Sequence, residues 1–251
     1  MRSGVTRRSP RCTSVAERSG LAVHGLNVSY GKSHVIRDLS LEVAPGEIVA
    51  LIGRNGAGKT TTIEAIAGLV RSQSGTIRID GVEIAKLASH RRARAGLAIV
   101  PSGGRLFPTL SVRENLDIAR SRPVADPWDL DRVFEVFPKL SAIPDRAAGA
   151  LSGGERQMVA FARALMTNPS VMLLDEPSEG LAPIVVETLA TLIPTLGASG
   201  VGIVLAEQNV RFALGAATRG YVLQKGVVEA EGTVPQLDNG LWQSYLSLSN
   251  D

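Results

Sequence analysis

Only one cysteine, Cys12, occurs among the 251 residues of the chain. A single cysteine cannot form a disulfide within the chain, which favours a reducing compartment over a secreted, disulfide-stabilised domain. Long apolar stretches are missing too, since no run approaches the roughly 18–20 residues that a helix needs to cross a bilayer. The sequence therefore predicts that this chain is not itself a channel or a carrier.

Excess positive charge is confined to the N-terminal end. Residues 1–20 contain five arginines and one acid, Glu17, so totals of 27 basic and 24 acidic residues leave 22 and 23 in the rest. The body is thus near neutral, and no nucleic-acid partner is expected. The Arg/Ser-rich tail lacks apolar periodicity and the apolar core of a secretory signal, which predicts disorder. A transit peptide and a start codon assigned too far upstream both stay open, and a nucleic-acid-binding arm is the least supported interpretation.

The order of apolar patterns predicts one domain over residues 21–251. Strand patterns occur at 21–30, 36–47, 47–53, 74–84, 171–177, 202–208 and 220–226. Helix patterns occur at about 59–69, 111–120, 129–138, 155–167 and 183–197. Because helices dominate between about 90 and 168, we expect an inserted helical lobe there. The alternation of strand and helix elsewhere predicts a parallel sheet with helices on both faces.

The segment GRNGAGKT, residues 53–60, matches the phosphate-loop pattern G-x-x-x-x-G-K-S/T. A predicted strand precedes it and a predicted helix follows it, which disfavours a chance match. Glycines allow backbone N–H groups to close around a phosphate, and Lys59 supplies positive charge to the β and γ oxygens. The Thr60 hydroxyl is placed to bind Mg²⁺, so the loop predicts a nucleotide site with a magnesium ion.

A buried-strand pattern, VMLLDEP, ends in two carboxylates. We expect Asp175 to reach the Mg²⁺ ion and Glu176 to orient and polarise an attacking water. Alone, Asp-Glu-Pro could simply end a strand and begin a helix, but a phosphate loop in the same chain makes that interpretation weaker. Tyr30, in the first strand pattern, could stack on adenine, although a half-buried strand tyrosine is the commoner case.

A second phosphate-binding pattern is LSGGERQ, residues 151–157, where a serine and two glycines begin a predicted helix. These motifs, in this order, resemble those of ATP-binding cassette (ABC) proteins, over about residues 21–250. The resemblance implies an α/β fold: a RecA-like P-loop NTPase core, an N-terminal antiparallel β subdomain and an inserted α-helical subdomain. It also implies a head-to-tail dimer, in which each ATP lies between the phosphate loop of one subunit and the LSGGERQ segment of the other.

The resemblance assigns roles to individual residues. ATP, as the nucleotide, is expected to contact Tyr30, Gly53, Arg54, Asn55, Gly56, Ala57, Gly58, Lys59, Thr60, Thr61, Ser152, Gly153, Gly154 and Glu155. Hydrolysis is assigned to Lys59, Glu176 and Gln208, and Mg²⁺ binding to Thr60, Asp175 and Ser102.

Further strings resemble a narrower branch, the cassettes of branched-chain amino acid importers, and they include IVPSGGRLFPTLSVRENL, LDEPSEGLAP and LAEQN. Cassettes for urea and short-chain amides belong to the same branch. The implied partners are a second, identical or different cassette, two transmembrane permease subunits and an external substrate-binding protein. The implied location is the cytoplasmic face of the inner membrane, with peripheral attachment through the permease.

Three positions depart from the general family pattern: Ser102, Gln208, and Ala182, where many cassettes have an aspartate. Ser102 stands where the family usually has a glutamine, and we expect slower or more partner-dependent hydrolysis from the shorter side chain. Gln208 replaces the usual histidine and can donate a hydrogen bond but cannot carry a proton near pH 7. A soluble ABC ATPase acting on DNA or ribosomes and an ATP-binding regulatory module are less favoured alternatives. The arginines at positions 91, 92 and 94 are expected to form a solvated surface.

Overall fold

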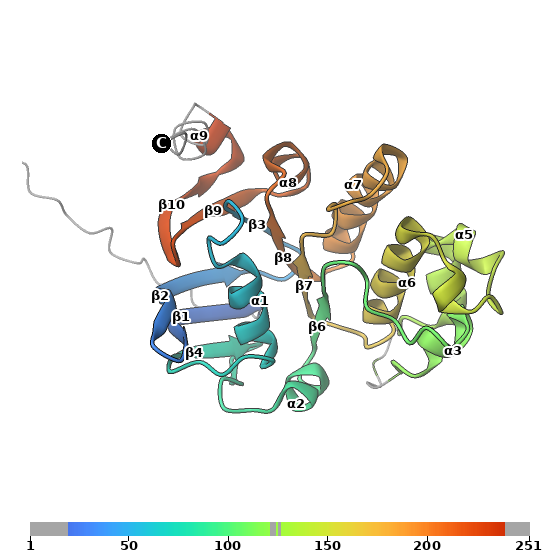
Figure 1. Ribbon diagram of the computed structural model, residues 1–251, viewed down its shortest axis with the longest axis horizontal. Coiled ribbons are helices and arrows are strands. Elements are labelled where there is room, and N and C mark those ends of the chain that lie inside the picture. The colour runs from blue at the N-terminus through green and yellow to red at the C-terminus, as the bar shows by residue number, and fades with distance from the viewer. Residues whose placement is uncertain (1–19, 121–123, 125–126, 239–251) are drawn as a thin grey trace, which may run out of the picture.

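The protein is described by a computed structural model covering residues 20–120, 124 and 127–238. The tail predicted over residues 1–20 lies outside the described residues apart from Gly20. Two sheets form the framework of the molecule (Figure 1). The larger sheet has six strands in the order β10–β9–β3–β8–β7–β6, and all neighbours are parallel except β9 and β10. Its strands are β3 (Ile48–Ile52), β6 (Leu97–Val100), β7 (Val171–Asp175), β8 (Gly202–Glu207), β9 (Arg219–Gln224) and β10 (Val227–Thr233).

The smaller sheet is antiparallel and has the order β2–β1–β4–β5. Its strands are β1 (Leu21–Tyr30), β2 (Ser33–Val43), β4 (Ser74–Ile79) and β5 (Val82–Glu83). Gly31 and Lys32 form the turn between β1 and β2, and the strand pattern at 74–84 forms the two strands β4 and β5.

Alternate residues of the central strands face two different hydrophobic cores. Val49 and Leu51 of β3 belong to a core shared with α1 and the smaller sheet, whereas Ala50 and Ile52 belong to a core shared with α6, α7 and α8. Both faces of the larger sheet are thus covered, as predicted, which explains why β3, β7 and β8 are buried along their whole length. These helices are α1 (Lys59–Ala67), α6 (Gly153–Leu165), α7 (Pro183–Ala198) and α8 (Val210–Ala216).

The inserted lobe is helical but shorter than predicted. Residues 97–100 form β6, which pairs with β7 in the larger sheet, so the lobe begins after Val100 instead of near residue 90. The helix predicted over 129–138 is two short helices, because Pro138 has no N–H to donate and restricts the backbone of Phe137. The remaining helices are α2 (Ser89–Arg94), α3 (Val112–Asp117), α4 (Leu130–Val136), α5 (Pro138–Ser141), the 3₁₀ turn Ala148–Ala150 and α9 (Val234–Asp238).

Arg92 contradicts the prediction of a solvated arginine cluster. Its side chain is only 3% exposed, and its guanidinium donates hydrogen bonds to the carbonyls of Ala65 and Ile66 at 2.8 Å each. It also donates to the carbonyls of Ala85 and Leu87. Arg92 thus caps the carbonyl end of α1, where the Ala65 carbonyl also accepts from the Gly68 N–H at 3.2 Å, and it connects α2 to α1.

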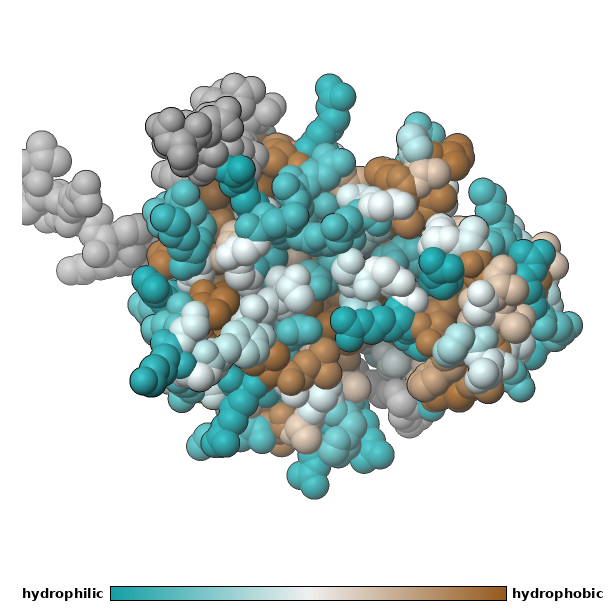
Figure 2. All heavy atoms as spheres, viewed as in Figure 1, coloured by the Kyte–Doolittle hydropathy of each residue, from teal (hydrophilic) through white to brown (hydrophobic). Residues whose placement is uncertain are grey.

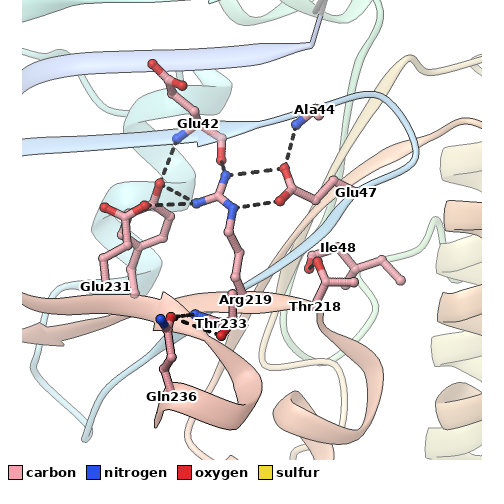
Figure 3. A network of polar contacts seen from close by, with 10 residues as sticks. Glu42, Ala44, Glu47, Ile48, Thr218, Arg219, Glu231, Thr233 and Gln236 are labelled. Atoms are coloured by element: carbon pink, nitrogen blue, oxygen red, sulfur yellow. Dashed lines mark hydrogen bonds and ion pairs between the residues drawn. The ribbon is translucent and has the colours of Figure 1, made fainter. Parts of the chain in front are cut away.

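A second arginine joins the two sheets (Figure 3). Arg219 at the start of β9 forms an ion pair with Glu47, with Nε 2.6 Å from Oε1, and donates to the Tyr221 hydroxyl at 2.7 Å and to the Glu42 carbonyl. Glu231 of β10 pairs with the same guanidinium at 3.2 Å. These contacts lie at the amino ends of β3 and β9, the edge of the sheet opposite to the phosphate loop that follows β3.

Candidate functional site

The phosphate loop follows β3 and ends where α1 begins, as predicted. A Cβ at Gly53 would lie 2.5 Å from the Leu223 carbonyl oxygen, and one at Gly58 would lie 2.6 Å from Cδ1 of Ile36. Gly58 also has φ = +109°, so both positions require glycine. No side chain caps α1, which leaves the N–H groups of its first turn available to an anion.

The other loop residues differ in exposure. Arg54, Asn55, Gly56 and Thr60 are exposed, Thr61 is half-buried, and Ala57 is buried. Half of the loop residues therefore lie at the surface, while Ala57 anchors the loop in the core that contains α1.

Lys59 is buried, with a relative exposure of 3%. Its Nζ donates to the carbonyl oxygens of Gly53 at 2.7 Å and Arg54 at 3.1 Å. The same ammonium lies 2.9 Å from Oε1 of Glu176, so the residue assigned to phosphate binding and the residue assigned to water activation form an ion pair.

Thr60 and Asp175 are brought together from different elements. The Thr60 hydroxyl, at the start of α1, donates to Oδ1 of Asp175, at the end of β7, at 3.1 Å. Burial raises the pKa of Asp175 to about 6, partly opposed by the bond from Thr60 and reinforced by the charge of Glu176. A buried carboxylate beside a hydroxyl is a set of hard oxygen donors that suits Mg²⁺.

Within the described part of the chain, no group of three or more His, Cys, Asp or Glu side chains is arranged to hold a metal. A magnesium ion held by Thr60 and Asp175 would therefore depend on phosphate oxygens and water for its other ligands, which is its usual behaviour in nucleotide sites. The ion would supply positive charge to the phosphates.

Because its pKa is raised, Asp175 binds its proton more tightly in the folded protein than in the unfolded chain. Its ionisation therefore lowers the free energy of unfolding as the pH rises from about 4 to above 6. We expect Asp175→Asn to stabilise the nucleotide-free protein by about 1–3 kcal/mol at pH 8 and by about a third of that amount at pH 4.5. Urea unfolding in EDTA at both pH values measures this difference. Asp145→Asn, at an exposed position, is the control, and an equal gain at both pH values for Asp175→Asn would contradict the prediction.

Glu176 has an unusual backbone conformation. Its φ is +46°, in the left-handed region that side chains rarely adopt, and its N–H donates to the Ala206 carbonyl at 2.8 Å. Such conformations cost roughly 1–3 kcal/mol and concentrate at functional sites. The end of β8 thus holds Glu176 where its side chain meets Lys59.

Three further predicted residues lie in loops or at the end of a strand. Gln208 is exposed and directly follows β8, and Tyr30 is 49% exposed at the end of β1. The Ser102 hydroxyl donates to Oε2 of Glu179 at 3.2 Å; among the described residues, no hydrogen bond joins it to Thr60 or Asp175. Metal binding by Ser102 and adenine stacking by Tyr30 stay predictions.

The LSGGERQ segment begins α6, as predicted. Ser152 is the N-cap residue, and its hydroxyl accepts from the Glu155 N–H while Oε2 of Glu155 accepts from the Ser152 N–H at 2.7 Å. The Glu155 carboxylate is thus engaged in capping the helix. Ser152, Gly153 and Gly154 line a cleft of about 580 Å³ together with the start of α7.

The two segments predicted to bind phosphate lie in different parts of the molecule. Helix α1 packs against one face of the larger sheet and α6 packs against the other (Figure 1).

Glu207 was not predicted as a site residue. It is the last residue of β8 and only 2% exposed, and its carboxylate accepts from the N–H groups of Ser178 at 2.9 Å and Asn209 at 3.3 Å. Burial raises its pKa, and the charge of Glu176 adds to the effect. The sequence signal that could have identified Glu207 is a glutamate at the end of the buried-strand pattern GIVLAE.

Comparisons with known proteins agree with this geometry. The family model described as ABC transporter matches residues 36–179. BraG of Pseudomonas aeruginosa, a high-affinity branched-chain amino acid transport ATP-binding protein, is 42% identical over 215 residues, which are 85% of this chain and 92% of BraG. LptB of Haemophilus influenzae, a lipopolysaccharide export system ATP-binding protein, is 41% identical over 224 residues, which are 87% and 92% of the two chains.

A solved structure of an ATP-binding subunit of an ABC transporter superposes with a TM-score of 0.81 at 28% identity, covering 92% of this chain and all of the other. The phosphate loop, the Thr60–Asp175 pair and the LSGGERQ helix start are therefore found on a cassette fold. The chain belongs to the ABC transporter family, as an ATP-binding subunit whose ATPase activity is coupled to transport.

Proposed function

We propose that this chain is the ATPase subunit of an importer for branched-chain amino acids. The proposal depends first on BraG, which is 42% identical along nearly its whole length. It is supported by the strings IVPSGGRLFPTLSVRENL, LDEPSEGLAP and LAEQN, which resemble the same branch. Urea and short-chain amides are alternative solutes within that branch.

Export of lipopolysaccharide is a second candidate, because LptB is 41% identical to this chain, almost the same value as BraG. Cassettes do not contact the transported solute, so the sequence of a cassette depends only indirectly on which solute is transported. The transported solute therefore has to be measured.

The proposed ATP site is divided between two cassettes. The phosphate loop, Thr60, Asp175 and Glu176 would bind one triphosphate, while Ser152, Gly153 and Gly154 would approach the γ-phosphate held by a partner cassette. The location of α1 and α6 on opposite faces of the sheet supports this division, since one chain offers each half of the site on a separate surface.

Lys59 connects binding to hydrolysis in this proposal. A triphosphate competes with Glu176 for the Lys59 ammonium, which now lies 2.9 Å from the carboxylate. Transfer of that cation to the β and γ oxygens would release Glu176 to accept a proton from the attacking water. Gln208 would donate a hydrogen bond to the γ-phosphate.

The helical lobe would transmit the closure of the cassette dimer to two permease subunits. In the described part of the chain, no helix is both long enough and apolar enough to cross a membrane. Apolar side chains gather over the lobe on the face seen in Figure 2, and Phe107 and Ile118 are 49% and 58% exposed. We propose that the lobe attaches the cassette to the cytoplasmic side of the permease and that an external binding protein delivers the solute.

The test compares solutes in source cells that carry either the intact gene or a Lys59→Ala copy. We expect uptake of labelled leucine to fall to the level of cells that lack the gene, because Lys59 is the cation closest to the predicted phosphate site. Uptake of labelled urea and the amount of lipopolysaccharide at the cell surface should stay unchanged. Lys86→Ala, at an exposed position outside the loop, is the matched control.

Each alternative has its own result in this experiment. A selective loss of urea uptake would assign the chain to the urea and amide importers. A selective loss of surface lipopolysaccharide would assign it to export. Normal leucine uptake with Lys59→Ala would contradict the branched-chain proposal.

A further inference from the structure

Glu207 is a buried carboxylate that the proposed mechanism does not use. It ends β8, between β3 and β7, at the edge where the phosphate loop and Asp175 also lie. Its side chain does not face solvent, being 2% exposed, so its oxygens depend on partners within the protein.

The partners of Glu207 come from two different loops. Oε1 accepts from the N–H of Ser178, two residues after Glu176, at 2.9 Å. Oε2 accepts from the N–H of Asn209, immediately after Gln208, at 3.3 Å. One carboxylate thus fixes the backbone just C-terminal to each of the two residues assigned to hydrolysis, Glu176 and Gln208.

Neighbouring contacts extend this connection. The Ala206 carbonyl accepts from the Glu176 N–H at 2.8 Å, so the last two residues of β8 hold the 176–178 loop at two points. Glu179 in turn accepts from the Ser102 hydroxyl at 3.2 Å. Three loops that surround the predicted γ-phosphate position are therefore linked through the end of β8.

We propose that Glu207 is a positioning residue for ATP hydrolysis, because its carboxylate fixes Gln208 and the Glu176 loop relative to each other. The two loops then reach their working positions together when the cassettes close on ATP. Glu207 itself touches neither the nucleotide nor the water. The inference rests on the proposed roles of Glu176 and Gln208.

Glu207→Gln tests the proposal with little change in volume. Its amide group can accept one of the two N–H bonds, but its NH₂ group then faces the other N–H donor, so one loop loses its anchor. We expect kcat to fall about 10- to 100-fold, as for small misplacements of catalytic groups, while the Kd for ATP changes less than about twofold. Glu207→Asp keeps both acceptors and should recover part of the lost kcat.

The assay uses the transporter complex purified from membranes through a tag on this chain, and it records ATP hydrolysis, ATP binding and thermal unfolding. The matched control is Glu47→Gln, which removes the partner of Arg219 at the opposite edge of the sheet (Figure 3). The control should lower the unfolding temperature and leave kcat unchanged well below that temperature. An equal loss of kcat in Glu47→Gln and Glu207→Gln would reduce Glu207 to a general stabilising residue and overturn the proposal.

A second measurement does not depend on hydrolysis. Amide hydrogen exchange should become faster in Glu207→Gln at Ser178 or at Asn209, whichever N–H then faces the NH₂ group in place of an acceptor oxygen. Unchanged exchange at both, or a normal kcat, would overturn the proposal. Glu176→Gln in the same assay separates a failure of the proposed function from a failure of this inference. If Glu176→Gln hydrolyses ATP at the normal rate, the assignment of Glu176 fails. A normal rate in Glu207→Gln alone refutes only the role of Glu207.

Discussion

Glu176→Gln is expected to lower kcat by about 10²- to 10⁴-fold, the usual contribution of a general base. Glutamine has the same shape as glutamate but cannot accept the proton of the attacking water. ATP binding should persist, because Lys59, the phosphate loop and the Thr60–Asp175 pair are all retained. The substitution also removes the Lys59–Glu176 ion pair of 2.9 Å and so frees the Lys59 ammonium for phosphate.

The measurement is steady-state ATP hydrolysis by the transporter complex, with ATP affinity determined separately by equilibrium binding. Glu187→Gln, an exposed carboxylate on α7, is the matched control and should hydrolyse ATP at the normal rate. Dimers of the Glu176→Gln protein should accumulate with bound ATP, because closure no longer leads to hydrolysis. A Glu176→Gln complex with normal kcat would require a different base.

Arg92→Ala is expected to lower the free energy of unfolding by about 3–5 kcal/mol, since two buried and two partly buried carbonyls lose a charged donor and a cavity opens behind them. For a chain of this size that corresponds to a fall of about 10 °C in the unfolding temperature. Helix α1 should be affected most, because two of the four carbonyls end that helix. Since α1 also carries Lys59 and Thr60, affinity for ATP should weaken in the folded fraction.

Thermal unfolding of Arg92→Ala and Arg91→Ala provides the comparison. Arg91 lies on the same helix but is exposed, so its removal should change the unfolding temperature by only a degree or two. Equal effects of the two substitutions would mean that the Arg92 hydrogen bonds contribute little net stability.

Local patterns predicted the elements that surround the site. The apolar runs of β3, β7 and β8 identified buried parallel strands because both of their faces meet a hydrophobic core. The glycines of the phosphate loop act within a few residues of each other, and so do the serine and two glycines that begin α6, so their spacing contains the information needed.

Elements that depend on distant partners were missed or misjudged. The four residues of β6 were assigned to the lobe because a short apolar run does not distinguish a strand from a helix segment. Arg92 looked like its neighbours Arg91 and Arg94, and only the end of α1 explains its burial. Glu207 was missed for the same reason, since its partners Ser178 and Asn209 come from two loops, one of them from a distant segment.

Gly154 has a consequence for how related sequences are interpreted. A Cβ at this position would lie 2.6 Å from Cγ2 of Val185, so α6 and the start of α7 touch only because the residue is glycine. The glycine is therefore required by helix contact within one subunit, independently of any phosphate held by another. A descendant that had stopped hydrolysing ATP would still be selected to keep it. Its presence in a sequence marks an intact contact between α6 and α7, and competence for catalysis has to be judged from the residues proposed to hydrolyse ATP, Glu176 and Lys59.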